Sequence, residues 1–190
     1  VRPVKSEPPT VSNTAWVANE IDHFILKRLE RRGLQPNGKA DKMHLLKRLS
    51  IELTGLLPSL ELRQEYREDD SPEATDKIIG RLLDSPSFGE RMAVLWMDIS
   101  RYSDSYGYQD DNIRTQWPYR DWVIHAFNKN LAYDKFITWQ LAGDLLPDAT
   151  KEQVLATAFN RNHKYTEEGG VIPEEYRVEY NVDKTKTFSK

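Results

Sequence analysis

The sequence contains no cysteine among its 190 residues. Without cysteine, these residues hold no disulfide, no thiolate metal site, no cysteine nucleophile and no covalently attached c-type haem. Long hydrophobic runs are also missing, so no membrane span is predicted. Charge of one sign is not in excess, because 27 Lys and Arg stand against 30 Asp and Glu, a formal net charge of −3. That balance argues against nucleic-acid binding through a broad basic face.

The length suits one domain, or one and a half, and a chain of this size buries roughly 70% of the surface that its unfolded form exposes. Residues 1–15 carry three prolines and several small polar residues, so they predict an extended leader. The leader has no apolar stretch of the secretory kind, which leaves open an earlier cleavage or excision from a longer protein. Residues 16–190 predict a single helical domain.

Apolar residues recur at helical spacing through most of this domain, and no β-type alternation of useful length occurs. The sequence therefore predicts an all-α fold, an irregular bundle of about seven or eight helices. We expect its core to come from the helices at 19–32, 41–53, 88–102 and 119–128. Two longer loops interrupt the pattern, at 103–118 and 162–172. Irregular loops of this length inside a compact domain are often functional.

The first candidate site lies where a helix gives way to the first loop. Asp98, Arg101 and Tyr102 follow one another at helical spacing and share one helix face. Asp104 and Tyr108 follow in the loop. Two acids, a guanidinium and phenols suit a sugar, an anion or a cation. The plainer interpretation, which we favour, is an Asp98–Arg101 pair that holds the loop, since exposed pairs of this spacing are common and weak.

The second candidate site is the pair Arg120 and Asp121, which stands among Trp117, Tyr119 and Trp122. A charged pair among so many aromatic residues is expected to be partly buried, and it then needs further hydrogen bonds. The pair is either a structural ion pair that locks two helices or the polar floor of an aromatic-walled pocket. We further expect the ionic side chains of this region to be shielded from water and to satisfy one another.

The third candidate site is an acid-rich stretch near the C-terminus. It holds six acids within seventeen residues: Glu167, Glu168, Glu174, Glu175, Glu179 and Asp183. Oxygen-rich groups suit Ca²⁺, and Glu167 and Glu168 together with His163 form a candidate metal site. The spacing matches no EF-hand loop and no HExxH motif. A solvated acidic face is therefore favoured over a metal site.

Five stretches carry a family resemblance and together cover most of residues 16–187. They are NEIDHFILKRLERRGL (19–34), LLKRLSIELTGLLPS (45–59), IIGRLLDSPSFGERMAVLWMDISRYSDSYGY (78–108), YRDWVIHAFNKNLAYDKFITWQLAGDLLP (119–147) and EEGGVIPEEYRVEYNVDKTKT (167–187). With these stretches the chain resembles the DUF1549 family, also called the planctomycete cytochrome-associated PSCyt2 domain. The matched motif positions are Asp98, Arg101, Tyr102, Asp104, Tyr119, Arg120, Asp121, Asp144, Glu174, Glu175 and Arg177.

The resemblance implies a setting for the chain. Similar proteins are large exported proteins, so a periplasmic or cell-surface location is implied. Cytochrome-c-like and DUF1553 domains of the same polypeptide are the implied partners, with haem in those neighbouring segments. Relatives carry a CxxCH haem-attachment motif just beyond the position of Lys190, whereas these residues contain no Cys and hold no covalent haem. No nucleic acid is expected as a partner.

Three functions follow as hypotheses, one of which is a structural domain that Ca²⁺ bound to the acid-rich stretch stabilises. The resemblance favours a helical module of an exported, haem-associated multidomain protein, and whether that module is an enzyme is left open. The alternative is a carbohydrate-active or sugar-binding domain, with or without a Ca²⁺ ion. In that alternative, aromatic rings stack on sugars while carboxylates bond hydroxyls or act as acid and base; the residues are Tyr106, Tyr108, Trp117, Trp122, Asp98, Asp104 and Asp111.

Overall fold

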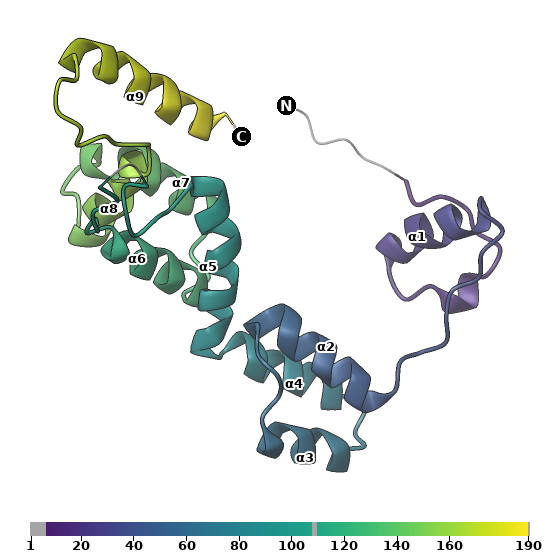
Figure 1. Cartoon of the computed structure of the whole chain (residues 1–190). Coiled ribbons are helices and arrows are strands. Elements are labelled where there is room, and N and C mark those ends of the chain that lie inside the picture. Colours follow the sequence, from purple (N-terminus) through teal and green to yellow (C-terminus); the bar gives the residue numbers. More distant parts are fainter. Residues whose placement is uncertain (1–6, 108–109, 190) are drawn as a thin grey trace. The chain divides into compact units, whose positions relative to one another are not determined.

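The computed structural model describes residues 7–107 and 110–189, and it divides after Asp41 into two compact units (Figure 1). The expected single domain over 16–190 includes parts of both units, so that boundary stays a prediction. Over the described ranges there are nine α-helices, three short 3-10 helices and no β-strand. The predicted all-α fold is therefore confirmed. None of the helices in these ranges has the length and apolar character needed to cross a membrane.

The first unit contains the 3-10 helix η1 (Thr14–Trp16) and helix α1 (Glu20–Glu30). The start of α1 is set by a capping box, in which the Asn19 side chain accepts the Asp22 N–H and the Asp22 carboxylate accepts the Asn19 N–H. The expectation that this helix joins the main core stays a prediction, because α1 belongs to the other unit. Ile21 and Ile25 of its apolar stripe are 70% and 49% exposed, while Leu26 is buried. The unit offers α1 little besides an extended leader to pack against.

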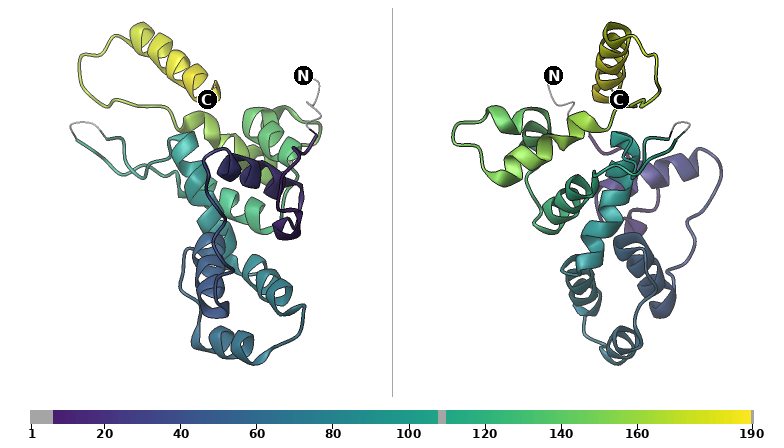
Figure 2. Two further views of the ribbon diagram at one scale, coloured as in Figure 1. Left: turned by 90° about the vertical axis from the view of Figure 1, so that its right-hand side faces the viewer. Right: turned by 60° about the vertical axis from the view of Figure 1, so that its left-hand side comes forward.

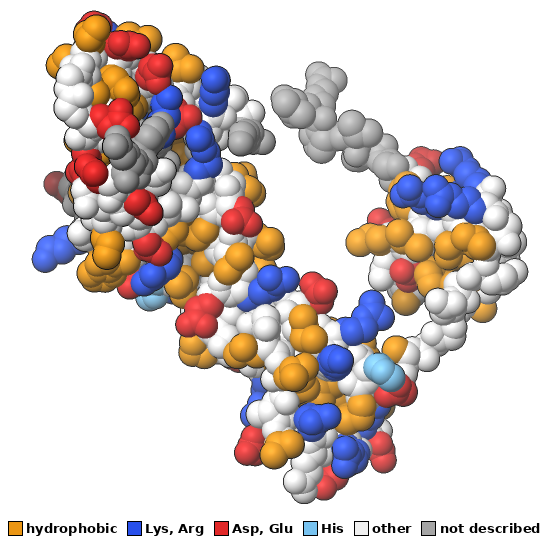
Figure 3. Space-filling model, viewed as in Figure 1, with side chains coloured by type: hydrophobic (Ala, Val, Ile, Leu, Met, Phe, Trp, Pro, Cys, Tyr) orange, Lys and Arg blue, Asp and Glu red, His pale blue; other side chains and the backbone are white. Residues whose placement is uncertain are grey.

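The second unit begins with three helices, α2 (Lys42–Thr54), α3 (Leu60–Glu68) and α4 (Ala74–Leu83). They enclose one hydrophobic cluster, made of Leu46, Leu62, Tyr66, Ala74, Ile78 and Leu82. Ser59 caps α3, because its hydroxyl accepts the Leu62 N–H at 3.2 Å. Basic, acidic and apolar side chains are interspersed over the visible face of these helices (Figure 3).

A second and larger cluster lies among four further helices. These are α5 (Pro86–Ser100), α6 (Trp117–Asn128), α7 (Tyr133–Ala142) and α8 (Lys151–Ala156), with the 3-10 helices η2 (Gly143–Leu145) and η3 (Thr157–Arg161). The buried members are Ala93, Tyr119, Trp122, Val123, Ala126, Phe136, Ala156 and Phe159. The expected contribution of the 88–102 and 119–128 helices to the core is confirmed. Helix α2 packs on α5 as well, which joins the two clusters.

Three neutral polar side chains sit inside the aromatic cluster. The Tyr119 hydroxyl donates to Gln140 Oε1 at 2.7 Å, and Trp96 Nε1 donates to both oxygens, at 3.0 Å and 2.8 Å. The Gln140 amide in turn donates to the Phe136 carbonyl oxygen. Burial raises the pKa of Tyr119 well above its ordinary value, so the phenol stays uncharged. The polar centre of this core is therefore neutral, whereas we expected ionic groups to be sequestered here.

The last helix, α9 (Pro173–Phe188), is reached through an extended connection (Figure 2). Pro173 occupies the first turn, where a missing N–H costs nothing. The helix packs back through Phe188, whose ring lies 5.4 Å from that of Phe159 between centroids. The same helix places Asp183 beside Arg101, at the end of α5.

Helices α5 and α6 approach each other closely at Gly89. Its N–H donates to Asn128 Oδ1 at 2.8 Å, and a Cβ added there would lie 2.5 Å from the Ile124 carbonyl oxygen. We expect Gly89→Ala to destabilise the chain by about 1–3 kcal/mol, because backbone must move to admit the methyl group. Urea unfolding followed by circular dichroism measures the loss.

Gly80 of α4 supplies the matched control, since a Cβ there meets no atom within 4 Å. Gly80→Ala should raise the free energy of unfolding by up to about 1 kcal/mol, because alanine reduces the entropy of the unfolded chain and favours the helix. Equal stability of the two variants would contradict the close crossing.

Candidate functional site

The two irregular loops lie against each other. Within the first, the Tyr106 N–H donates to the Asn112 carbonyl oxygen at 3.1 Å and the Arg114 N–H donates to that of Asp104 at 2.9 Å, so the loop folds back on itself. The Asn112 side chain then donates to Glu167 Oε2 of the second loop at 2.7 Å. The two loops therefore form one continuous surface.

Asp183 of α9 holds this surface to the end of α5. Its carboxylate accepts from Arg101 Nη1 at 2.5 Å and from the Lys164 N–H at 3.0 Å. Arg101 ends α5 in the left-handed conformation, with φ 59°. Burial alone would raise the pKa of Asp183, but these hydrogen bonds and the two nearby cations lower it below its ordinary value. Asp183 is 9% exposed and charged, and it joins three segments.

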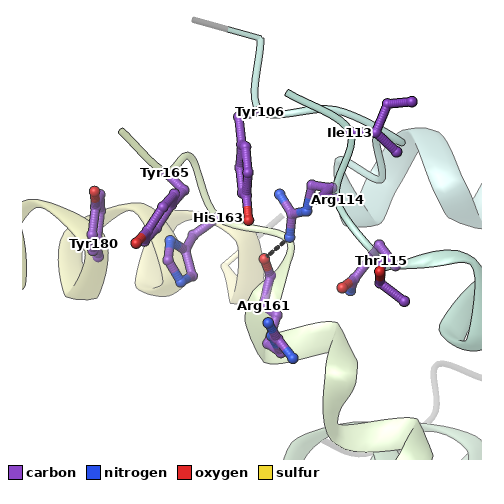
Figure 4. A pocket seen from close by; sticks show the side chains of 9 residues that line it. Tyr106, Ile113, Arg114, Thr115, Arg161, His163, Tyr165 and Tyr180 are labelled. Atoms are coloured by element: carbon purple, nitrogen blue, oxygen red, sulfur yellow. Dashed lines mark hydrogen bonds between the residues drawn. The ribbon is translucent and has the colours of Figure 1, made fainter. Parts of the chain in front are cut away.

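A cleft of about 670 Å³ opens beside this junction. Its lining comes from both loops, the end of η3 and α9: Tyr106, Ile113, Arg114, Thr115, Gln116, Arg161, His163, Tyr165 and Tyr180. Figure 4 shows Tyr180, Tyr165 and Tyr106 in a row, with Arg114 beyond Tyr106.

The row is a stack of planar groups. Ring centroids are 5.9 Å apart for Tyr180 and Tyr165 and 5.0 Å apart for Tyr165 and Tyr106. The guanidinium carbon of Arg114 lies 5.6 Å from the Tyr106 centroid, a cation–π arrangement. Both faces of Tyr165 and of Tyr106 are thus occupied by neighbours. What these two residues offer to the cleft is their ring edges and hydroxyls.

The cleft carries uncompensated positive charge. Arg114 donates to the Arg161 carbonyl oxygen, and no carboxylate of the described residues lies within 4.0 Å of either guanidinium. Burial lowers the pKa of Arg114, and the charge of Arg161 adds to that effect, although a guanidinium remains protonated at neutral pH. Two cations that share one open cleft favour an anion.

His163 lines the cleft and is neutral at pH 7. Burial lowers the pKa of its imidazole, and the charge of Lys184 acts in the same direction. Its Nδ1 lies 2.6 Å from the Lys164 carbonyl oxygen, and its ring packs on Tyr180 at 4.8 Å between centroids. The hydrogen bond at Nδ1 leaves Nε2 available as an acceptor.

Two buried side-chain amides, those of Gln116 and Asn162, bond to each other next to the cleft. Gln116 donates to the Ala158 carbonyl oxygen and to Asn162 Oδ1, each at 2.8 Å. The amide nitrogen of Asn162 is buried and has no acceptor in the described part of the chain. These contacts fix Gln116 at the junction between the first loop and α6.

The residues of the first candidate site divide into two groups in the structure: Arg101 turns to α9, whereas Tyr102 and Asp104 stay together beside Arg120. Arg101 pairs with Asp183, so the favoured Asp98–Arg101 pair is wrong. Asp98 is exposed on α5. The Tyr102 hydroxyl donates to Asp104 Oδ1 at 2.6 Å, and burial together with this acid raises the pKa of Tyr102 to about 12. Tyr108 lies outside the described residues.

The second candidate site is on the surface. Arg120 Nη2 and Asp121 Oδ1 are 2.9 Å apart, and their side chains are 42% and 51% exposed. The expected partial burial therefore holds for Arg120, which is half-buried as a residue, and is wrong for Asp121, which is exposed. Tyr119, Trp122 and Val123 turn the apolar side of α6 inward, which leaves the two charged residues toward solvent. Among the described residues the pair forms no ion pair with a second helix, although the charge of Arg120 acts on Tyr102 and Asp104. Neither Arg120 nor Asp121 lines the cleft.

The acid-rich stretch does not form a single ligand set. Glu174 and Glu175 are exposed, and Glu174 pairs with Arg177 one turn away. Glu167 bonds to Asn112, as described above. Within the described ranges, no three His, Asp or Glu side chains gather in a way that would hold a metal ion. The calcium site at Glu167, Glu168 and His163 stays a prediction.

Sequence reasoning missed most of the cleft. Arg114, Tyr165 and Tyr180 were in none of the candidate sets, and His163 was considered as a metal ligand alone. One signal was available, since each loop combines tyrosine with arginine: Tyr106 with Arg114, and Tyr165 with Arg161. Nothing in the sequence indicated that the two loops meet.

A comparison with known protein families finds a match for most of the chain. The family model PSCyt2, described as a protein of unknown function (DUF1549), matches residues 20–190. Neither the curated proteins nor the solved structures give a match.

We expect Asp183→Asn to destabilise the docking of α9 by about 1–3 kcal/mol, because a part-buried cation loses its charged partner. The folded-state pKa of Asp183 is lowered, so its stabilising effect is present above the unfolded pKa of about 3.9 and is lost as pH falls through and below that value. Hydrogen exchange of the α9 amides should be faster in the variant at pH 7, and the difference should shrink toward pH 3.

Arg120→Ala should change the free energy of unfolding by less than about 0.5 kcal/mol, because exposed ion pairs contribute little. Thermal and urea unfolding at pH 7 measure it. A loss above about 2 kcal/mol would contradict this and would indicate that Arg120 supports a buried acid.

Proposed function

Because the chain belongs to the PSCyt2 (DUF1549) family, we propose that it is a helical module of an exported multidomain protein that packs against haem-bearing segments of the same polypeptide. The family membership carries this proposal, through the cytochrome named in the family's designation. Haem in the neighbouring segments is part of the proposal, since covalent c-type attachment needs cysteine and these residues have none. Cytochrome-c-like and DUF1553 domains are the proposed partners.

An apolar groove of the second unit is the proposed contact surface for the haem-bearing segments. It measures about 340 Å³ and lies between α5, α7, η3 and the end of α9. The groove is lined by Trp96, Ile99, Tyr133, Ile137, Gln140, Leu141, Phe159, Thr187 and Phe188, none of which carries a charge at neutral pH. The exposed edge of a c-type haem and the protein surface around it are apolar too, so burying one against the other is favourable.

The proposed function is tested in a longer polypeptide that carries this chain together with its haem-bearing segments. The absorption spectrum and midpoint potential of the haem are measured with and without residues 42–190. We expect removal to alter haem loading or to shift the potential, because the module shields the haem edge from water. Unchanged loading and potential would refute the proposal.

Ile99→Asp separates contact at the groove from folding of the module. Ile99 lines the groove and is 48% exposed, whereas Val94 on the same helix is 52% exposed and lies outside the groove. Ile99→Asp should shift the haem potential, and Val94→Asp should leave it at the wild-type value. Equal effects of the two substitutions would mean that the groove is not the contact.

A further inference from the structure

We propose that the tyrosine and arginine cleft binds an acidic sugar, that is, a hydroxyl-rich ring with one oxyanion group of the sulfate, phosphate or carboxylate kind. This site is separate from the apolar groove, and its ligand is independent of haem. Three features of the cleft support the assignment: its charge, its hydroxyls and its size.

The charge selects an oxyanion. Arg114 and Arg161 have no carboxylate partner among the described residues, although acids are near. Those acids are engaged elsewhere, Asp183 with Arg101 and Glu179 with Lys164. A guanidinium binds sulfate, phosphate or carboxylate through two parallel hydrogen bonds.

Arg114 is held ready for such a ligand. Its guanidinium stacks on Tyr106, and one of its nitrogens donates to the Arg161 carbonyl oxygen. The remaining N–H groups have no partner in the described part of the chain. A side chain ordered before binding loses less entropy when the ligand arrives, which increases affinity.

The tyrosine hydroxyls of the cleft favour a ligand whose oxyanion is attached to a hydroxyl-rich group. The hydroxyls of Tyr106 and Tyr165 have no hydrogen-bond partner among the described residues. Nε2 of neutral His163, which lines the same cleft, adds an acceptor (Figure 4). A nucleobase or another flat ligand would need a free ring face, whereas Tyr106 and Tyr165 have both faces covered. Ring edges and hydroxyls suit a ligand that is itself rich in hydroxyl groups.

The volume favours a ligand larger than a free inorganic anion. A cleft of about 670 Å³ falls within the range of about 300–1,000 Å³ typical of organic ligands. A sulfate or phosphate ion fills only a small part of such a space. The anion is therefore expected to be one group of a larger molecule.

The binding experiment compares four sugars that differ in one group. Glucose, glucose 6-sulfate, glucose 6-phosphate and glucuronate are titrated into the full chain by isothermal calorimetry, with inorganic sulfate and phosphate alongside. At least one acidic sugar should bind ten-fold or more tightly than glucose and more tightly than its inorganic ion. The rank order identifies the oxyanion. If none of the acidic sugars binds more tightly than glucose, the proposal is wrong.

Substitutions assign that binding to the cleft. Arg114→Gln should weaken the preferred acidic sugar ten-fold or more. Arg161→Gln is the second variant. The side chain of Arg161 is exposed and makes no hydrogen bond or ion pair within the described ranges, so we expect the variant to fold as the wild type does. It should weaken the same sugar in the same direction.

Arg177→Gln is the matched control, since Arg177 is an exposed arginine of α9 that pairs with Glu174 outside the cleft. It should bind as the wild type does. Wild-type affinity in both cleft variants, or an equal loss in the control, would overturn the assignment.

Discussion

The hydrogen-bonded group of Trp96, Tyr119 and Gln140 is the interaction on which the larger core depends. Each of the three comes from a different helix, α5, α6 or α7, and each needs the other two to satisfy polar atoms that the aromatic cluster removes from water. The group therefore specifies how the three helices meet. Because α5 and α6 are the two ends of the first long loop, their packing also decides where that loop leaves the core.

A pair of charged side chains lies at the edge of the larger core. Arg101 at the end of α5 and Asp183 in α9 form a part-buried pair whose geometry is completed by the Lys164 N–H. One carboxylate thus connects a helix end, the second loop and the last helix. The cleft depends on this junction, since its tyrosines come from the first loop, the second loop and α9. Stability of the junction and shape of the cleft are consequently linked.

Two faces of the second unit differ in chemistry. The groove beside Ile99 and Phe188 has no charged lining, whereas the cleft beside Arg114 is positive and rich in hydroxyls. An apolar surface gains most by covering another apolar surface, and a positive, hydroxylated one gains most from an oxyanion with hydroxyls. The two surfaces therefore suit different occupants, which is why the haem-associated role and the sugar site are independent proposals.

Local features of the sequence determined the helices and the two loops, because caps, breakers and apolar spacing act over a few residues. The matched stretches of sequence determined the family. Ser59 before α3 and Pro173 at the start of α9 are examples. The tertiary structure alone decided that Arg101 pairs with Asp183, that the Arg120–Asp121 pair faces solvent, and which side chains line the cleft. Those outcomes depend on which segments more than 40 residues apart in the chain come into contact. A periodic pattern describes one helix at a time, so it does not say which distant segment that helix contacts.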